Sequence, residues 1–139
     1  MQFDTTTEFG ARAARRLAEE DVVWLTTVGA DGTPQPSPVW FLWDGETALM
    51  YSQPDRPKLR NIARTGRASL SFNTDANGDD VVILTGDAWI DHDAAPATAI
   101  PEFIAKYVRG MAHVGQTAEE FARDYPVAVR VRPTKLRGF

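Results

Sequence analysis

Residues 34 to 43 read Pro34-Gln35-Pro36-Ser37-Pro38-Val39-Trp40-Phe41-Leu42-Trp43, with proline at every second position of the first half. Alternate residues of a strand present their backbone N–H groups to the same edge, so the three missing N–H groups share one edge and only the other edge can pair. The preceding run 22–28 is β-branched and aromatic, and the turn signal Ala30-Asp31-Gly32-Thr33 separates the two. The sequence therefore predicts a β-hairpin over residues 22–43.

Four further strands bring the predicted total to six. They cover residues 47–52, 67–73, 81–90 and 127–132, with Gly86 as a bulge or close-approach site and Pro133 as the end of the last strand. Hairpin turns outnumber the crossovers that a parallel sheet needs. The pattern favours a mainly β fold, a small antiparallel β-barrel with helical insertions.

Three helical regions interrupt the strands. The first is an amphipathic helix after the capping-box spacing of residues 5–8, and the second is a short helix from Pro57 to Arg64 that Gly66 terminates. The third region covers 91–125, where Pro101 starts a helix over 102–109 and residues 117–120 form a second capping box.

Composition limits the kind of protein this can be. The 139 residues, 43% of them hydrophobic, fit one domain over residues 1–139. A net charge of −4 disfavours a nucleic-acid-binding surface and makes any anion site local. The absence of cysteine excludes disulfides, thiolate nucleophiles and iron–sulfur clusters. Without an apolar leader or a membrane-length apolar run, we expect a soluble cytoplasmic protein that does not engage membranes.

Common catalytic and metal-binding motifs are missing. The sequence has no dinucleotide-binding glycine motif, P-loop, zincin helix or hydrolase elbow. The two histidines, His92 and His113, fall near helix ends or loops, where a solvated role is the common one. The residues therefore identify no metal site and no catalytic acid, base or nucleophile.

The segment 54–68 is strongly basic. Its net charge is +4 in a chain of net charge −4, because it contains a single acidic residue, Asp55, and five basic residues, Arg56, Lys58, Arg60, Arg64 and Arg67. The cluster lies where a strand leads into a helix, and a helix N-terminus attracts phosphate. Asn61 follows Lys58 on the same helix face, and Ser52 ends the preceding strand. The alternative is a solvated basic helix that forms surface ion pairs.

Aromatic residues accompany the proline-rich strand. An unpaired strand edge beside Trp40 and Trp43 offers backbone polar groups and apolar walls to a flat heterocycle. Core or subunit-interface packing is the alternative role of the four tryptophans. Together, the basic segment 54–68 and the aromatic residues of the proline-rich strand indicate a nucleotide-like cofactor that carries a phosphate.

Several stretches resemble one known family. The sequence over 22–28, 31–41, 51–52, 56–61 and 84–88 resembles the pyridoxamine 5′-phosphate oxidase-like split-barrel flavin and deazaflavin proteins, and more narrowly their actinobacterial F420-dependent reductase branch. The resemblance covers nearly the whole chain in order. It implies an FMN-binding-like homodimer of six-stranded split β-barrels, with cofactor sites at the subunit interface.

The resemblance also implies roles for particular residues. The cofactor phosphate would be held by Ser52, Arg56, Lys58 and Asn61. The backbone of Pro38, Val39 and Trp40 would line the tricyclic ring, and Arg137 would reach the ring or tail. The ending 135–139 lacks the Arg-x-His of pyridoxamine phosphate oxidase itself, which argues against vitamin metabolism.

We therefore expect an F420 (deazaflavin)-dependent oxidoreductase that transfers a hydride to an electron-poor C=C or C=O of a small organic substrate. In such an enzyme the cofactor supplies the chemistry and the protein supplies position and water exclusion, so no dedicated catalytic residue follows. Two alternatives stay open: an FMN-dependent oxidoreductase of the same fold, and a non-catalytic flavin, deazaflavin or haem carrier.

Overall fold

The predicted hairpin is present in the computed structural model, which describes residues 3–139. Strand β1 (Val22–Val28) pairs antiparallel with β2 (Pro34–Trp40), and Trp24 lies opposite Pro38. β2 is an edge strand of the sheet and pairs only with β1. This register is possible because the prolines of β2 direct their missing N–H groups to the open edge.

The sheet has seven strands, so the predicted count of six is wrong. The segment expected as one strand over 34–43 divides at Phe41 into β2 and the short β3 (Leu42–Trp43). The Phe41 backbone leaves the ladder because its N–H donates to the Tyr107 hydroxyl (2.7 Å) and its carbonyl accepts from Lys106 Nζ (2.8 Å). These partners come from a helix far along the chain, which local sequence patterns do not reveal.

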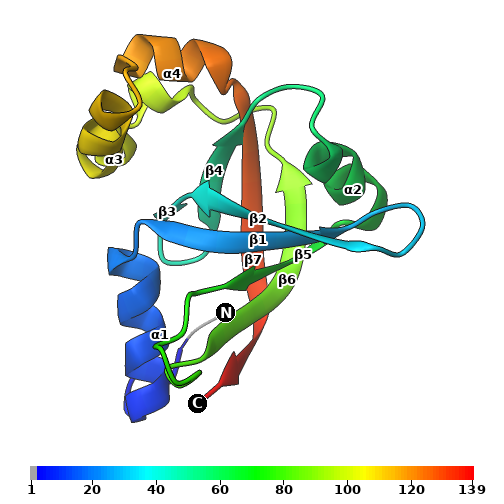
Figure 1. Cartoon of the computed structure of the whole chain (residues 1–139), viewed down its shortest axis with the longest axis vertical. Helices are drawn as coiled ribbons and strands as arrows, with labels where there is room; N and C mark the ends of the chain where they lie inside the picture. Colours follow the sequence, from blue (N-terminus) through cyan, green and yellow to red (C-terminus); the bar gives the residue numbers. More distant parts are fainter. Residues whose placement is uncertain (1–2) are drawn as a thin grey trace.

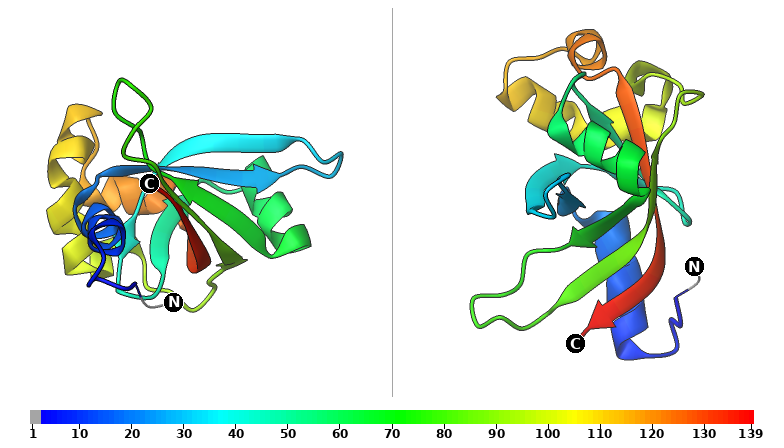
Figure 2. Two further views of the ribbon diagram at one scale, coloured as in Figure 1. Left: turned by 90° about the horizontal axis from the view of Figure 1, so that it is seen from below. Right: turned by 90° about the vertical axis from the view of Figure 1, so that its right-hand side faces the viewer.

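The seven strands form one curled antiparallel sheet, a half-barrel (Figures 1 and 2). Their order is β2-β1-β5-β6-β7-β4-β3. The remaining strands are β4 (Ala48–Ser52), β5 (Arg67–Ser71), β6 (Val82–Ile90) and β7 (Val127–Gly138). The mainly β, split-barrel-like fold with helical insertions is thus confirmed.

Strand β7 does not end at Pro133 as predicted but continues to Gly138. A β-bulge accommodates the proline. The pairing register shifts between Thr85 and Gly86 of β6, so that Gly86 lies opposite Pro133 and Thr85 lies opposite Lys135. The predicted close approach at Gly86 is confirmed, because a Cβ there would lie 2.0 Å from the Arg132 carbonyl oxygen. The bulge explains why a proline is tolerated inside this strand.

Helix α1 (Glu8–Glu19) begins after Thr7, whose side chain accepts from Gly10 N, so the capping box predicted over residues 5–8 is wrong. Helix α2 (Pro57–Thr65) starts at Pro57 as predicted. It ends where Gly66 adopts a left-handed conformation (φ 66°) and donates its N–H to the Ile62 carbonyl.

The region 91–125 contains a short 3₁₀ turn and two helices rather than continuous helix. They are η1 (Ala97–Ala99), α3 (Pro101–His113) and α4 (Ala118–Asp124). The predicted capping box of α4 is confirmed, since Thr117 and Glu120 bond reciprocally to each other's backbone N–H. These helices lie together at one end of the sheet (Figure 1). No helix within residues 3–139 is long and apolar enough to cross a membrane.

Strand β4 separates two apolar cores. All five of its residues are buried. Ala48 and Met50 belong to the core inside the curled sheet, whereas Leu49 and Tyr51 belong to a second core beneath η1, α3 and α4. The alternation of a strand places successive side chains on opposite faces, so β4 holds the barrel and the helices together.

Candidate functional site

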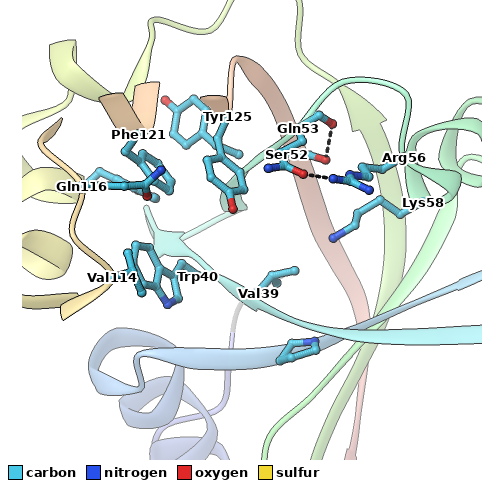
Figure 3. Close-up of a pocket in the computed structure, with 13 residues that line it drawn as sticks. Val39, Trp40, Ser52, Gln53, Arg56, Lys58, Val114, Gln116, Phe121 and Tyr125 are labelled. Atoms are coloured by element: carbon cyan, nitrogen blue, oxygen red, sulfur yellow. Dashed lines mark hydrogen bonds between the residues drawn. The ribbon is translucent and has the colours of Figure 1, made fainter. Parts of the chain in front are cut away.

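A cavity of about 460 Å³ opens beside the ends of β2 and β4, between α2 and the α3–α4 helices (Figure 3). Figure 3 shows its two ends: Arg56 and Lys58 on one side, and Trp40, Val114 and Phe121 on the other. The lining residues are Pro38, Val39, Trp40, Tyr51, Ser52, Gln53, Arg56, Lys58, Phe103, Val114, Gln116, Phe121 and Tyr125.

The two charged side chains of the cavity stand at the N-terminus of α2. Arg56 is the residue before the helix, and Pro57 fixes the first helical position, so both cations join the positive end of the helix dipole. Burial lowers the pKa of the Lys58 ammonium, and the Arg56 guanidinium lowers it further. Neither cation forms an ion pair with a carboxylate in the described part of the chain.

The turn between β4 and α2 positions these cations. The Arg56 guanidinium donates to the side-chain oxygen of Gln53, and the buried Ser52 hydroxyl donates to the Gln53 backbone carbonyl (2.8 Å; Figure 3). The proton of Ser52 is therefore used within the turn, while its oxygen stays able to accept. The arrangement suits a ligand that brings several acceptor oxygens to the guanidinium and ammonium groups.

The opposite end of the cavity is aromatic. The Trp40 ring stacks on Tyr107 with centroids 4.7 Å apart and on Phe121 at 5.6 Å, and Phe121 stacks on Tyr125 at 4.7 Å. Gly110 of α3 makes room for the indole, since a Cβ at this position would lie 2.9 Å from Trp40 Cζ2. The end of β2 is thereby held against both helices.

Tyr107 anchors this arrangement. Its hydroxyl accepts from Phe41 N (2.7 Å) and lies within donating distance of the carbonyl oxygens of Phe41 (2.8 Å) and Asp21 (2.7 Å). Burial raises the pKa of the Tyr107 hydroxyl. Because the neutral form is the one that donates, the contacts described here belong to neutral Tyr107.

The structure brings six of the eight residues that the sequence singled out to this cavity, namely Pro38, Val39, Trp40, Ser52, Arg56 and Lys58. Asn61 is buried instead between α2 and the first hairpin, where its amide donates to Thr27 Oγ1 (3.1 Å) and Gln35 Oε1 (2.8 Å). Arg137 is exposed near the C-terminal end of β7, opposite Ile83. In Figure 1 the C-terminal end of β7 lies away from the α3–α4 helices. The cofactor roles assigned to all eight stay predictions.

Sequence reasoning missed the helical wall of the cavity. Phe103 and Tyr107 lie four residues apart on α3, and Phe121 and Tyr125 do the same across the end of α4. This spacing marks an aromatic helix face and was available in the sequence. Which face meets the cavity depends on how α3 and α4 fold back onto β4, and no local pattern encodes that.

The sequence profile of the pyridoxamine 5′-phosphate oxidase family matches residues 9–138. The chain belongs to this family.

Solved structures with the same fold include three of contrasting names. An F420 reductase is 27% identical, with a TM-score of 0.66, and the match covers 88% of this chain and 94% of the other. General stress protein 26 from Bacillus anthracis has a TM-score of 0.67 at 15% identity, covering 91% and 89%. A haem storage protein from Vibrio cholerae has a TM-score of 0.60 at 16% identity, covering 99% and 95%. No curated protein matches the sequence.

Proposed function

We propose that this protein is an F420 (deazaflavin)-dependent oxidoreductase that reduces an electron-poor C=C or C=O of a small organic molecule. The observation that carries the proposal is the pair Arg56 and Lys58, which faces the cavity without a carboxylate partner among residues 3–139. The family assignment and the 27% identity to a structure named F420 reductase support the choice of cofactor class.

The donor set fits a phosphate-bearing cofactor. Burial and the neighbouring Arg56 guanidinium both lower the pKa of the Lys58 ammonium, and a phosphoryl group between the two cations would compensate their repulsion. The charge-assisted contacts it would make are the strong kind of hydrogen bond. Arg56 and Lys58 would hold the phosphate, with the positive end of α2 adding to the attraction. Ser52 and Asn61 remain proposed contacts of the same group, and each would have to exchange its present acceptor for a phosphate oxygen: the Ser52 hydroxyl now donates to the Gln53 carbonyl, and the Asn61 amide to Thr27 and Gln35.

The backbone of Pro38, Val39 and Trp40 would line the cofactor ring from the open edge of β2. When bound, a reduced deazaflavin supplies the hydride. The protein's part is to fix the relative positions of donor and acceptor and to exclude water, which the stacked Trp40 and Phe121 would do at the aromatic end. Arg137 is proposed to approach the ring or tail from a second subunit.

We propose that two copies of the chain form a homodimer with the cofactor sites at their interface. The open edge of β2 and the exposed side chains of Trp24 and Val28 on β1 support a contact surface on this hairpin. Sedimentation velocity should give twice the 15.4 kDa mass of the chain. A monomer that binds cofactor with full affinity would contradict the interface site.

The deciding experiment is a parallel titration of the purified protein with F420, FMN and FAD, followed by fluorescence. We expect F420 to bind most tightly and Lys58→Ala to weaken it. An FMN preference would make this a flavin enzyme of the same fold. Tight binding without cofactor oxidation across a panel of electron-poor substrates would make it a carrier, and no binding of any phosphate-bearing cofactor would refute the proposal.

A further inference from the structure

Three hydroxyl groups line the cavity, and two of them already donate a hydrogen bond to a backbone carbonyl of the protein. The Ser52 hydroxyl donates to the Gln53 carbonyl at 2.8 Å, and the Tyr51 hydroxyl donates to the Ala95 carbonyl at 2.7 Å. The third hydroxyl, on Tyr125, has no hydrogen-bond partner in the described structure, residues 3–139. Tyr125 is therefore the cavity hydroxyl that has a proton to offer a ligand.

The surrounding residues hold the Tyr125 ring in place. It caps the C-terminus of α4, with its backbone N–H bonded to the Phe121 carbonyl at 2.8 Å. Its ring stacks on Phe121 with an interplanar angle of 15°, and Phe121 stacks on Trp40 at 24°. A hydroxyl on a stacked and half-buried ring is more preorganised than one on a mobile side chain.

The end of the cavity that contains Tyr125 carries no charged lining residue within the described chain, since both lining cations stand at the α2 end. Its other walls are aromatic or aliphatic apart from Gln116, whose amide donates to Asp124 Oδ2 at 3.0 Å. An ionic ligand would lose its hydration here without compensation, whereas a flat apolar ring would gain stacking contacts.

We propose that this aromatic end is the substrate subsite, that it takes uncharged, planar, conjugated carbonyl compounds, and that the Tyr125 hydroxyl donates a hydrogen bond to their carbonyl oxygen. This inference rests on the proposed function for the source of the hydride. The hydrogen bond orients the carbonyl and draws electron density toward its oxygen, which favours hydride addition to the conjugated system. The hydride forms the new C–H bond, the displaced π electrons move onto the carbonyl oxygen, and the resulting enolate or alkoxide takes its proton from solvent. Tyr125 is then the residue that selects carbonyl compounds over hydrocarbons of the same shape.

The test uses the full chain without cofactor and two neutral probes of similar shape, 1-indanone and its carbonyl-free analogue indane. Tryptophan fluorescence or ligand-observed NMR measures binding to the wild type, to Tyr125→Phe and to Val114→Ala. The Phe variant retains the stacked ring, and the Val114 variant alters the same wall without touching a hydroxyl.

We expect Tyr125→Phe to weaken 1-indanone binding by about 3- to 10-fold, the loss of one neutral hydrogen bond, and to leave indane unchanged. Val114→Ala should affect both probes alike. Equal affinities of wild type and Tyr125→Phe for 1-indanone, or equal losses for both probes, would overturn the inference.

F420 titration of Tyr125→Phe separates this inference from the proposed function. Unchanged F420 affinity with a selective loss of 1-indanone supports both. If no cofactor binds to any variant and the selective loss persists, the proposed function fails while the carbonyl subsite stands.

Discussion

Replacing Tyr107 by phenylalanine removes one oxygen atom from the point where α3 holds the end of β2. The ring and its 4.7 Å stacking on Trp40 stay. What is lost is the acceptor of the Phe41 N–H and the donor to the carbonyls of Phe41 and Asp21. Tyr107 is 3% exposed and Phe41 0%, so water does not replace the missing partner.

The expected cost follows from these contacts. Leaving the buried Phe41 N–H without an acceptor costs about 1–3 kcal/mol. The loss of the hydrogen bond that Tyr107 donates adds less than a second cost of this size, since the hydroxyl has a single proton to share between two acceptors. We expect Tyr107→Phe to lower the free energy of unfolding by about 2 kcal/mol. For a chain of this size that lowers Tm by roughly 5–10 °C.

Urea titration followed by far-UV circular dichroism measures the change, with Tyr125→Phe as the matched control. The Tyr125 hydroxyl has no partner in the described structure, so its removal should change stability by less than about 0.5 kcal/mol. Equal unfolding midpoints for wild type and Tyr107→Phe would refute the role assigned to the Tyr107 hydroxyl.

Alkaline pH tests the same residue in a second way. In the unfolded chain Tyr107 ionises near pH 10, whereas burial raises its pKa in the folded protein. Above about pH 10 the unfolded chain therefore binds fewer protons, and stability should fall by up to about 1.4 kcal/mol per pH unit for this residue. The pKa of Tyr51 is also raised by burial, and its contribution should persist in Tyr107→Phe while that of Tyr107 disappears. An unchanged alkaline slope in the variant would contradict this account.

The remaining predictions concern the cofactor site and the sheet. Lys58→Ala should weaken the binding of F420 by about 1–3 kcal/mol in the parallel titration, and unchanged affinity would remove Lys58 from the site. Because the pKa of Lys58 is lowered, Lys58 loses its charge at a lower pH than an exposed lysine does, and the affinity of the wild type for F420 should fall in that pH range. This pH-dependent fall in affinity should be absent from Lys58→Ala. Gly86→Ala should cost at least about 2 kcal/mol in urea unfolding, because its Cβ would lie 2.0 Å from the backbone oxygen of Arg132, and wild-type stability would contradict the bulge geometry. Asn61→Ala should lower the free energy of unfolding by about 1–3 kcal/mol, because its contacts with Thr27 and Gln35 are lost, and an unchanged value would contradict this role. A loss of F420 affinity, measured under conditions where the variant is folded, would support the predicted phosphate contact of Asn61.

The parts of the fold that the sequence predicted are those fixed by local chemistry. The prolines of β2 determine which edge pairs, and Pro57 and Gly66 bound α2, because each of these residues restricts or permits particular backbone angles. The cationic end of the site was readable for the same reason, since Arg56 and Lys58 flank a helix start.

What the sequence did not predict depends on contacts between distant segments. The break at Phe41 requires Tyr107, sixty-six residues later, and the passage of β7 through Pro133 requires the bulge at Gly86. The aromatic end of the cavity exists because α3 and α4 pack onto one face of β4. The sequence of β4 does not show which of its residues face the barrel core and which face the helices. Both faces of the strand are buried, so its residues are apolar or small throughout instead of alternating with polar ones.

The division of the molecule by β4 gives the two ends of the cavity separate origins in the chain. Residues 52–58 build the cationic end on the barrel side, and residues 101–125 supply most of the aromatic end from the helical side. Chimeras that exchange only the helical segment between homologues should therefore inherit the small-molecule preference of one parent and the cofactor of the other. Such independence would let one scaffold diversify its chemistry by replacing a contiguous block of about two dozen residues.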